Sequence, residues 1–299
     1  MAEWTEVCRA GKKPPQGKQP ENAKQRRKRQ EAAETSLALL VSGDDDGGSS
    51  REFLVENVRQ WALVLKQSTF YQEAVSGMAL GTARRRFCRI VSLGIGNFAS
   101  SKPALLQLAL ALCLQKDFLE DSDEAAADDD KPKCVAYDPH FTPREMEACR
   151  DLGIVVPLRA ENGVHNVAGK STLFFMPHCP YRLYSSVLWQ NWQHLSSVFI
   201  IGNSFSSYHL RSISPSMPLD CDCIRLLQSL TEEQTLWNTQ HAVAPGAAGR
   251  RESIYPHMER AFADTSFHFF PEVSAGCVEG ASTPLRPPLD PWPGPDGEE

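Results

Sequence analysis

Short apolar runs alternate with segments of helical length between residues 87 and 201. Continuous apolar runs are typical of strands that are covered on both faces of a sheet, and the segments between them have helical periodicity. The alternation therefore predicts an α/β domain, Rossmann-like, with a mainly parallel sheet and helices on both faces. Strands are expected at residues 87–93, 134–137, 154–156, 172–176 and 198–201.

Helix signals support the same pattern. Ser101 is a candidate N-cap with Pro103 in the first turn of a helix that continues to about residue 116. This helix is apolar nearly all round, which predicts burial on more than one side. Thr142 and Glu145 have capping-box spacing. Further helices are expected at residues 53–65, 70–80, 142–152, 181–192 and 220–230, and an edge element at 267–270.

Both ends of the chain lack the apolar residues that a core needs. We expect a disordered basic tail and linker over residues 1–50, and an α/β domain with a helical lead-in over 51–271. Residues 272–299 are expected to form a flexible, Pro-rich, acidic tail. The basic cluster at residues 24–29 fits a nuclear import signal or a nucleic-acid contact, and it equally fits a solvated tail.

Composition narrows the class of protein. Of 299 residues, 41% are hydrophobic, which is enough for a core, and the net charge of −6 argues against direct nucleic-acid binding by the whole protein. Nine cysteines without a repeating spacing indicate reduced, intracellular thiols. No apolar run is long enough to span a bilayer, and the amino terminus lacks a signal-peptide core, so we expect no membrane partner.

A glycine motif follows the first predicted strand. Gly94-Ile95-Gly96-Asn97-Phe98-Ala99 matches G-x-G-x-x-G/A between a strand and a helix. The first glycine permits the turn, the second lets a ligand approach the backbone, and the helix N–H groups attract an anion. Asp138 ends the second strand and could hold a ribose hydroxyl, although it lies about twice as far along the chain as this pattern expects. The alternative is a tight turn, with Asp138 capping another turn before Pro139.

The fourth predicted strand ends in Pro177-His178-Cys179-Pro180. Thiolate and imidazole are ligands that haem iron accepts. A Cys-Pro pair often leaves the sulfur on an exposed turn, and adjacent side chains point different ways, so only His178 or Cys179 could bind a given iron. The alternative is that the two prolines only shape the turn. No neighbouring base marks Cys179 as a nucleophile, and catalytic use is not expected.

The fifth strand ends in Gly202-Asn203-Ser204-Phe205. Asn203, Ser204 and Tyr208 could line a crevice shared with the other strand ends, or they could satisfy backbone groups of the turn. Parallel strands deliver their carboxyl ends to one edge of a sheet, where ligands bind. Candidate ligand-binding residues are therefore Gly94, Gly96, Asn97, Asp138, Asn203 and Ser204, with His178 or Cys179 for haem. Glu145 and Glu147 show no pairing that indicates acid–base chemistry.

Five blocks of sequence together resemble the SRR-like family, named after the plant protein Sensitivity to Red Light Reduced, which also has vertebrate SRR-domain members. The resemblance covers about residues 51–271. The blocks are Ser92-Leu93-Gly94-Ile95-Gly96-Asn97-Phe98, Tyr137-Asp138-Pro139, Pro177-His178-Cys179-Pro180, Gly202-Asn203-Ser204-Phe205 and Ala261-Phe262-Ala263-Asp264-Thr265-Ser266. The family more often has Asn where this chain has Ala263, and no catalytic residues are established that could be carried over.

Two hypotheses of function follow. The resemblance implies a regulatory protein, cytoplasmic and nuclear, linked to circadian rhythm, clock-gene expression and regulation of haem biosynthesis. The resemblance and the Cys-Pro pair together favour sensing of haem through Cys179 or His178. The protein partners are unknown. The alternative is a Rossmann-like enzyme that binds a nucleotide or S-adenosylmethionine over Gly94 and Gly96. Enzyme activity is left open, and the first hypothesis is preferred.

Overall fold

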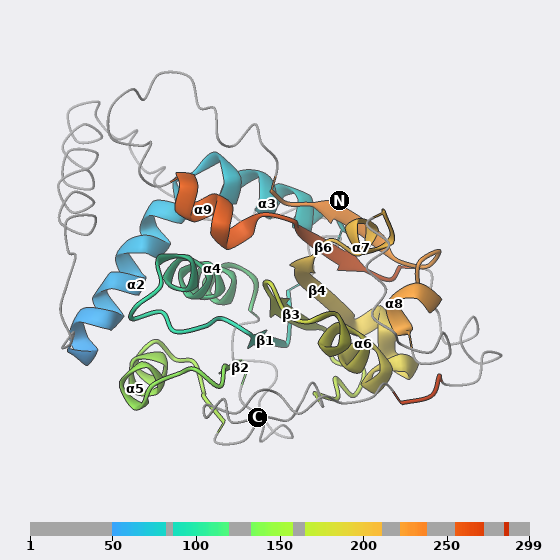
Figure 1. Cartoon of the computed structure of the whole chain (residues 1–299), viewed down its shortest axis with the longest axis horizontal. Coiled ribbons are helices and arrows are strands. Elements are labelled where there is room, and N and C mark those ends of the chain that lie inside the picture. The colour runs from blue at the N-terminus through green and yellow to red at the C-terminus, as the bar shows by residue number, and fades with distance from the viewer. Residues whose placement is uncertain are drawn as a thin grey trace, which may run out of the picture. The chain divides into compact units, whose positions relative to one another are not determined.

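A computed structural model describes residues 50–81, 86–119, 133–157, 165–210, 222–237, 255–271 and 284–286 of the chain. Over these residues the protein is a mixed α/β fold on a six-stranded, mostly parallel sheet in the order β2-β1-β3-β4-β6-β5 (Figure 1). The basic cluster at residues 24–29 and most of both predicted tails lie outside the described residues.

Four parallel strands form the greater part of the sheet. β1 (Arg89–Leu93) lies between β2 (Cys134–Tyr137) and β3 (Thr172–Met176), and β4 (Val198–Asn203) follows β3. Because all three pairings are parallel, the carboxyl ends of these strands lie at one edge of the sheet. Nearly all of their residues are buried, as expected for strands covered on both faces. These strands agree closely with the prediction.

The antiparallel end of the sheet differs from the prediction. β6 (Thr265–Phe269) pairs with β4 on one side and with β5 (Glu232–Thr235) on the other, so the last apolar stretch lies inside the sheet instead of at its edge. The edge strand β5 is exposed or half-buried, and its polar residues discourage pairing with other chains. The strand expected at residues 154–156 is reduced to one parallel bridge between Val155 and Val135.

Helices cover both faces of the sheet (Figure 1). On one side lie α2 (Arg51–Lys66), α3 (Thr69–Gly81), α4 (Lys102–Phe118) and α9 (Tyr255–Phe262), and on the other lie α6 (Tyr181–Gln190) and α8 (Cys223–Leu226). The other helices of the described residues are α5 (Pro143–Asp151), which packs on α2, the 3-10 helix η1 (Trp192–Ser197) and α7 (Phe205–Leu210). α8 is shorter than predicted and begins after Asp222, whose side chain caps it.

α4, on the same side of the sheet as α2, α3 and α9, is buried along most of its length. The Ser101 side chain accepts a hydrogen bond from the Ala104 amide at 3.4 Å, and Pro103 occupies the first turn, as predicted. α4 packs against both α2 and α9, which explains why it is buried on more than one side. Phe118 at its end contacts Phe87, which in turn contacts Phe199 of β4, with ring centroids 6.2 and 5.1 Å apart.

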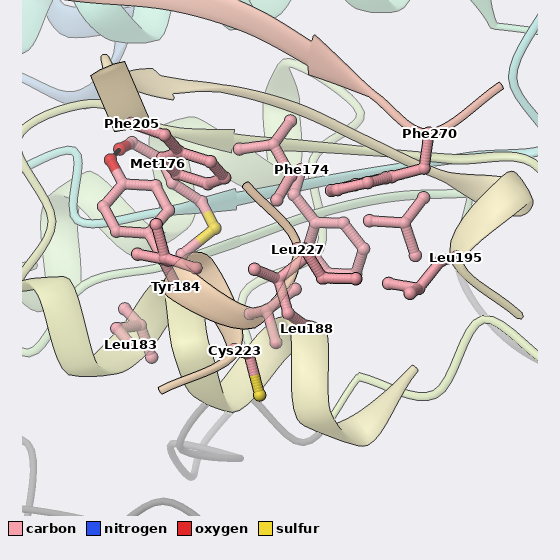
Figure 2. Close-up of a cluster of buried hydrophobic side chains, with 14 of the residues drawn as sticks. Phe174, Met176, Leu183, Tyr184, Leu188, Leu195, Phe205, Cys223, Leu227 and Phe270 are labelled. Atoms are coloured by element: carbon pink, nitrogen blue, oxygen red, sulfur yellow. Dashed lines mark hydrogen bonds between the residues drawn. The ribbon is translucent and has the colours of Figure 1, made fainter. Parts of the chain in front are cut away.

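A hydrophobic cluster fills the space between the sheet and α6 (Figure 2). Side chains alternate between faces along a strand, so every second residue of β1, β3 and β4 points into this cluster. From the opposite side come the apolar residues of α6, η1 and α8. The central members are Val91, Phe174, Met176, Tyr184, Leu188, Leu195, Ile200, Phe205, Leu227 and Phe270.

The six cysteines of the described residues form no disulfide bonds. Cys88 is half-buried, whereas the other five are buried. Burial raises the pKa of Cys113, Cys134 and Cys149 to about 12. Separately, within the described part of the chain, no helix combines the length and the apolar character needed to cross a membrane.

Gly202 lets Tyr184 pack directly on the backbone of β4. The Tyr184 hydroxyl donates to the Met176 carbonyl and accepts a hydrogen bond from the Asn203 amide at 2.9 Å. A Cβ atom at position 202 would lie 2.6 Å from that hydroxyl and 3.0 Å from the Met176 carbonyl oxygen. Neither neighbour can move freely, because Tyr184 is fully buried and the carbonyl belongs to a central strand.

We expect Gly202→Ala to lower the free energy of unfolding by about 1–3 kcal/mol, the usual cost of overpacking a core. Urea unfolding followed by circular dichroism measures the change. Gly77→Ala is the matched control, since a Cβ there meets only the side-chain end of Gln234, which can move aside. Equal losses in the two variants would contradict the role given to Tyr184.

Candidate functional site

The residues singled out in the sequence gather at the carboxyl ends of the four parallel strands. Gly96 is hydrogen-bonded to Asp138, Cys179 to the Leu93 carbonyl, and His178 to Asn203. The turns after β1, β2, β3 and β4 are thereby joined into one cluster, which we call the strand-end cluster: Gly94, Gly96, Asn97, Asp138, His178, Cys179, Asn203 and Ser204.

The glycine turn after β1 has the backbone conformation that its sequence suggests. Gly94 and Gly96 have φ values of 71° and 81°, a region that strains residues with a Cβ. The side-chain oxygen of Asn97 is directed at Ser100 and not at the strand ends. That oxygen accepts hydrogen bonds from the Ser100 amide and hydroxyl at 2.9 and 2.8 Å, which shapes the turn before α4.

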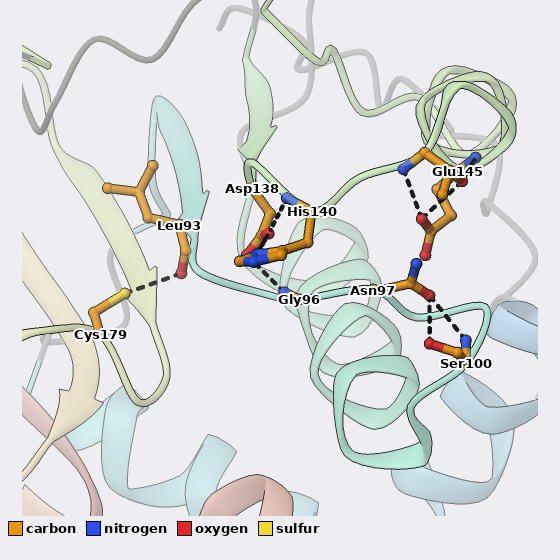
Figure 3. Close-up of polar contacts among 9 residues, drawn as sticks. Leu93, Gly96, Asn97, Ser100, Asp138, His140, Glu145 and Cys179 are labelled. Carbon is orange, nitrogen blue, oxygen red and sulfur yellow. Dashed lines mark hydrogen bonds and ion pairs between the residues drawn. The ribbon is translucent and has the colours of Figure 1, made fainter. Parts of the chain in front are cut away.

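Asp138 binds the glycine turn with its own carboxylate (Figure 3). Its Oδ2 accepts a hydrogen bond from the Gly96 amide at 2.7 Å. Its Oδ1 accepts from the His140 amide at 2.8 Å and contacts the His140 Nδ1 at 3.0 Å. The Asp138 side chain is only 4% exposed, whereas that of His140 is 63% exposed. The acid that could have held a ribose hydroxyl therefore closes the turn in this structure.

Glu145 closes the other half of the same turn. Its Oε1 accepts a hydrogen bond from the Ala99 amide at 2.9 Å, and its Oε2 accepts from the Thr142 amide and hydroxyl, both at 2.8 Å (Figure 3). The predicted capping box of α5 is confirmed, and its glutamate also binds the turn before α4. The sequence reveals the cap but not the contact to Ala99, which lies 46 residues away.

These two carboxylates reverse the electrostatics expected of a glycine-rich turn. Such a turn before a helix attracts anions because its N–H groups are unpaired and the helix dipole is positive there. Here the amides of Gly96 and Ala99 already bind protein carboxylates. A phosphate at this place would have to displace Asp138 or lie beside its negative charge.

Asn203 holds the turn after β3 in place. Its Oδ1 accepts a hydrogen bond from the His178 amide at 2.8 Å, and its Nδ2 donates to the Cys179 carbonyl at 3.3 Å and to the Tyr208 hydroxyl at 2.7 Å. His178 has a φ of 53°, an uncommon value for a residue with a side chain. The amide of Asn203 is therefore fully used in fixing this turn.

His178 is the exposed member of the pair considered for haem. Its Nε2 lies 3.1 Å from the Ala261 carbonyl oxygen at the end of α9, and Gln107 of α4 donates to the same oxygen at 3.0 Å. The contact joins the turn after β3 to the helices of the opposite face. An exposed imidazole fits the role of an iron ligand.

Cys179 is buried instead of exposed. The side chain belongs to the hydrophobic cluster under α6, and its thiol lies 3.3 Å from the Leu93 carbonyl oxygen, to which it donates (Figure 3). Burial, followed by the nearby charge of Asp138, raises the pKa of this thiol well above its usual value. A neutral, enclosed sulfur is a poor nucleophile and does not fit a ligand for haem iron in this conformation.

Ser204 directly precedes α7 and borders a pair that the sequence did not indicate, the half-buried Glu233 and the buried His268. The Ser204 hydroxyl accepts a hydrogen bond from the Ser207 amide at 3.0 Å. Burial alone would raise the pKa of Glu233 in β5, but hydrogen bonds from Ser204 and Ser206 and the neighbouring His268 outweigh it, so the pKa is lowered. Burial lowers the pKa of His268 to about 4. Glu233 was missed because a polar edge strand leaves no apolar pattern.

The fold and the strand-end cluster define a mixed α/β protein with a mostly parallel sheet. Within the described residues, no group of three or more His, Cys, Asp and Glu side chains could hold a metal ion. The profile of the SRR1 domain matches residues 62–269, and the chain belongs to the SRR1 domain family.

Relatives support this membership. The SRR1-like protein of Mus musculus is 31% identical over 231 residues, which cover 71% of this chain and 88% of the mouse protein. The SRR1-like protein of Drosophila melanogaster is 28% identical, covering 70% of this chain and 65% of its own. Protein SENSITIVITY TO RED LIGHT REDUCED 1 of Arabidopsis thaliana is 29% identical, covering 61% and 58%. No solved structure matches the chain significantly.

We expect Glu145→Gln to lower the free energy of unfolding by about 1–3 kcal/mol, because the amide NH₂ would face a backbone donor that needs an acceptor. Chemical denaturation gives the value. Glu147→Gln is the matched control: it removes the same charge from an exposed position of α5 and should stay within about 0.5 kcal/mol of the wild type. A neutral Glu145→Gln would show that the carboxylate does not hold the turn.

Proposed function

We propose that the protein is a regulatory protein that acts by binding, in circadian rhythm and clock-gene expression and in the regulation of haem biosynthesis. Membership of the SRR1 domain family supports a regulatory role, as does the name of the plant relative, which refers to red-light sensitivity. The proposal includes a cytoplasmic and nuclear location, for which the basic cluster at residues 24–29 is suited.

The main support from the structure is that the polar groups of the strand-end cluster bind one another. Asp138 and Glu145 bind the glycine turn, Asn203 binds the next turn, and the Cys179 thiol binds a carbonyl. An acid–base or nucleophilic enzyme needs such groups directed at a substrate. Groups that fix loops instead produce a rigid surface, which suits recognition of a partner.

A response to haem, as part of this proposal, would depend on His178. Its ring is exposed and lies at the surface of the strand-end cluster, whereas Cys179 faces the hydrophobic cluster. Imidazole is a common axial ligand of haem iron. The exposed ring could exchange its contact with the Ala261 carbonyl for an iron atom without opening the core.

We expect His178→Asn to weaken hemin binding by at least about tenfold, or about 1.4 kcal/mol, in an absorbance titration of the full chain. Asn is chosen because it tolerates the positive φ at this position. Cys179→Ser is the control, since a hydroxyl can still donate to Leu93, and it should bind hemin like the wild type. Sensitivity of the serine variant alone would assign the iron to Cys179. Hemin that fails to bind the wild type would contradict the haem part of the proposal.

A second candidate function is a Rossmann-like enzyme that binds a nucleotide or S-adenosylmethionine. It is favoured by the strand order, which reverses between β1 and β3 beside the glycine turn, because open α/β sheets bind ligands at such a point. Residues 154–156 can be counted as an additional strand beside β2 because of the Val155 bridge. Numbered in chain order, the parallel strands then lie in the order 3-2-1-4-5, with β3 and β4 as the fourth and fifth, as in dinucleotide-binding sheets. The Asp138 carboxylate disfavours a phosphate, so S-adenosylmethionine, which carries a sulfonium cation and no phosphate, is the better fit.

Thermal unfolding with a panel of ligands tests this alternative. S-adenosylmethionine at about 100 times its Kd should stabilise the native state by about 2.7 kcal/mol and raise the Tm by several degrees, whereas ATP and NAD should not. Asp138→Asn removes the negative charge beside Gly96. In this variant, the difference in Tm shift between S-adenosylmethionine and the phosphate-containing ligands ATP and NAD should become smaller. An unchanged Tm with every ligand would reject the enzyme and leave the regulatory proposal in place.

A further inference from the structure

A short segment near the carboxyl terminus lies against α6. The indole Nε1 of Trp189 donates a hydrogen bond to the Pro284 carbonyl oxygen at 2.8 Å. The guanidinium carbon of Arg286 lies 5.6 Å from the centre of the Trp189 ring, within the range of a cation–π contact. The Pro284 carbonyl and the Arg286 guanidinium of one short segment therefore both contact Trp189.

The sequence of the segment matches a known mode of recognition. Residues 284–287 read Pro-Leu-Arg-Pro, a P-x-x-P pattern with an arginine. Segments of this kind adopt the polyproline II conformation, whose carbonyl groups form no internal hydrogen bonds and are free to accept one from a partner. Domains that bind them do so with surface aromatic side chains. Trp189 provides such a ring together with an N–H donor.

The contact lies away from the strand-end cluster. α6 begins at Tyr181, directly after the turn that carries His178, and Trp189 lies in its last turn. The helical rise of about 1.5 Å per residue separates the two by about 12 Å along the helix. The contact at Trp189 is therefore separate from the strand-end cluster and does not depend on the proposed function.

We propose that Trp189 is the anchor of a recognition site for extended, arginine-containing P-x-x-P segments, and that this chain's own segment occupies it through residues 284–286. Leu285 is 62% exposed, so the contact gains little from apolar burial. The contact with Trp189 forms because the segment belongs to the same chain. A short covalent tether gives the segment an effective concentration in the millimolar range. A P-x-x-P segment of a partner protein with an affinity better than millimolar would displace it.

The test uses the full chain and a peptide with the sequence of residues 284–291, PLRPPLDP. Fluorescence anisotropy of the labelled peptide measures its Kd, and the ¹⁵N–¹H signal of the Trp189 indole reports the occupant. In Arg286→Ala, the indole signal should move, and the peptide should bind about tenfold more tightly than to the wild type, because the internal competitor is weakened. A peptide with alanine in place of arginine should bind more weakly to both chains.

Two tryptophans form the matched pair of variants. Trp189→Phe keeps an aromatic ring but loses the N–H that binds Pro284, and it should weaken peptide binding at least tenfold. Trp192→Phe loses an indole N–H that is buried without a hydrogen-bond partner, and it should bind like the wild type. Equal binding by the two variants, or an indole signal that Arg286→Ala leaves unchanged, would overturn the proposal. An indole signal that depends on protein concentration would place the segment of a second copy at the site and overturn the intramolecular form.

Discussion

The hydrogen bond between the Gly96 amide and the Asp138 carboxylate joins the turns after β1 and β2 at the carboxyl edge of the parallel strands. A buried carboxylate is unstable without partners, and so is an unpaired backbone amide, and each satisfies the other here. Hydrogen bonds to charged groups contribute about 1.5–3 kcal/mol, more than neutral ones. With Glu145 bound to Ala99 in the same way, the turn between β1 and α4 is fixed by two acids from the β2–α5 segment. A ligand at this edge would therefore meet a turn whose Gly96 and Ala99 amides are already occupied by two carboxylates.

α6 connects the two regions to which we assign binding. The turn before it is fixed by Asn203 and presents His178, while its last turn presents Trp189 to residues 284–286. Between these ends, one side of the helix lies in the hydrophobic cluster through Tyr184 and Leu188, so the helix cannot shift without disturbing the sheet. The two regions are thus carried by one rigid element.

Much of the fold could be predicted because local signals and the global fold agree. The four parallel strands are continuous apolar runs, and the caps at Ser101 and Thr142 are local features that lie within three residues of their partners. β5 could not be predicted, since Glu232–Thr235 is polar and is a strand only because β6 pairs with it. The position of β6 inside the sheet is likewise set by long-range pairing, which its apolar sequence does not encode.

The candidate site was predictable in its location but not in its contacts. Parallel strands must bring their ends together, so the grouping of Asp138, His178 and Asn203 follows from topology. Whether Asp138 faces a ligand or the Gly96 amide depends on distances between turns 42 residues apart. The burial of Cys179 depends on the side chains of α6 and α8, which the adjacent prolines do not reveal.

The burial of the thiols bears on how the protein meets oxidants. Oxidation proceeds through the thiolate, and a pKa near 12 leaves almost no thiolate at neutral pH. Of the six cysteines in the described residues, Cys88 alone is not buried. Among these six cysteines, peroxide would therefore oxidise Cys88 before the buried ones, and the packing around the buried sulfur atoms would stay intact.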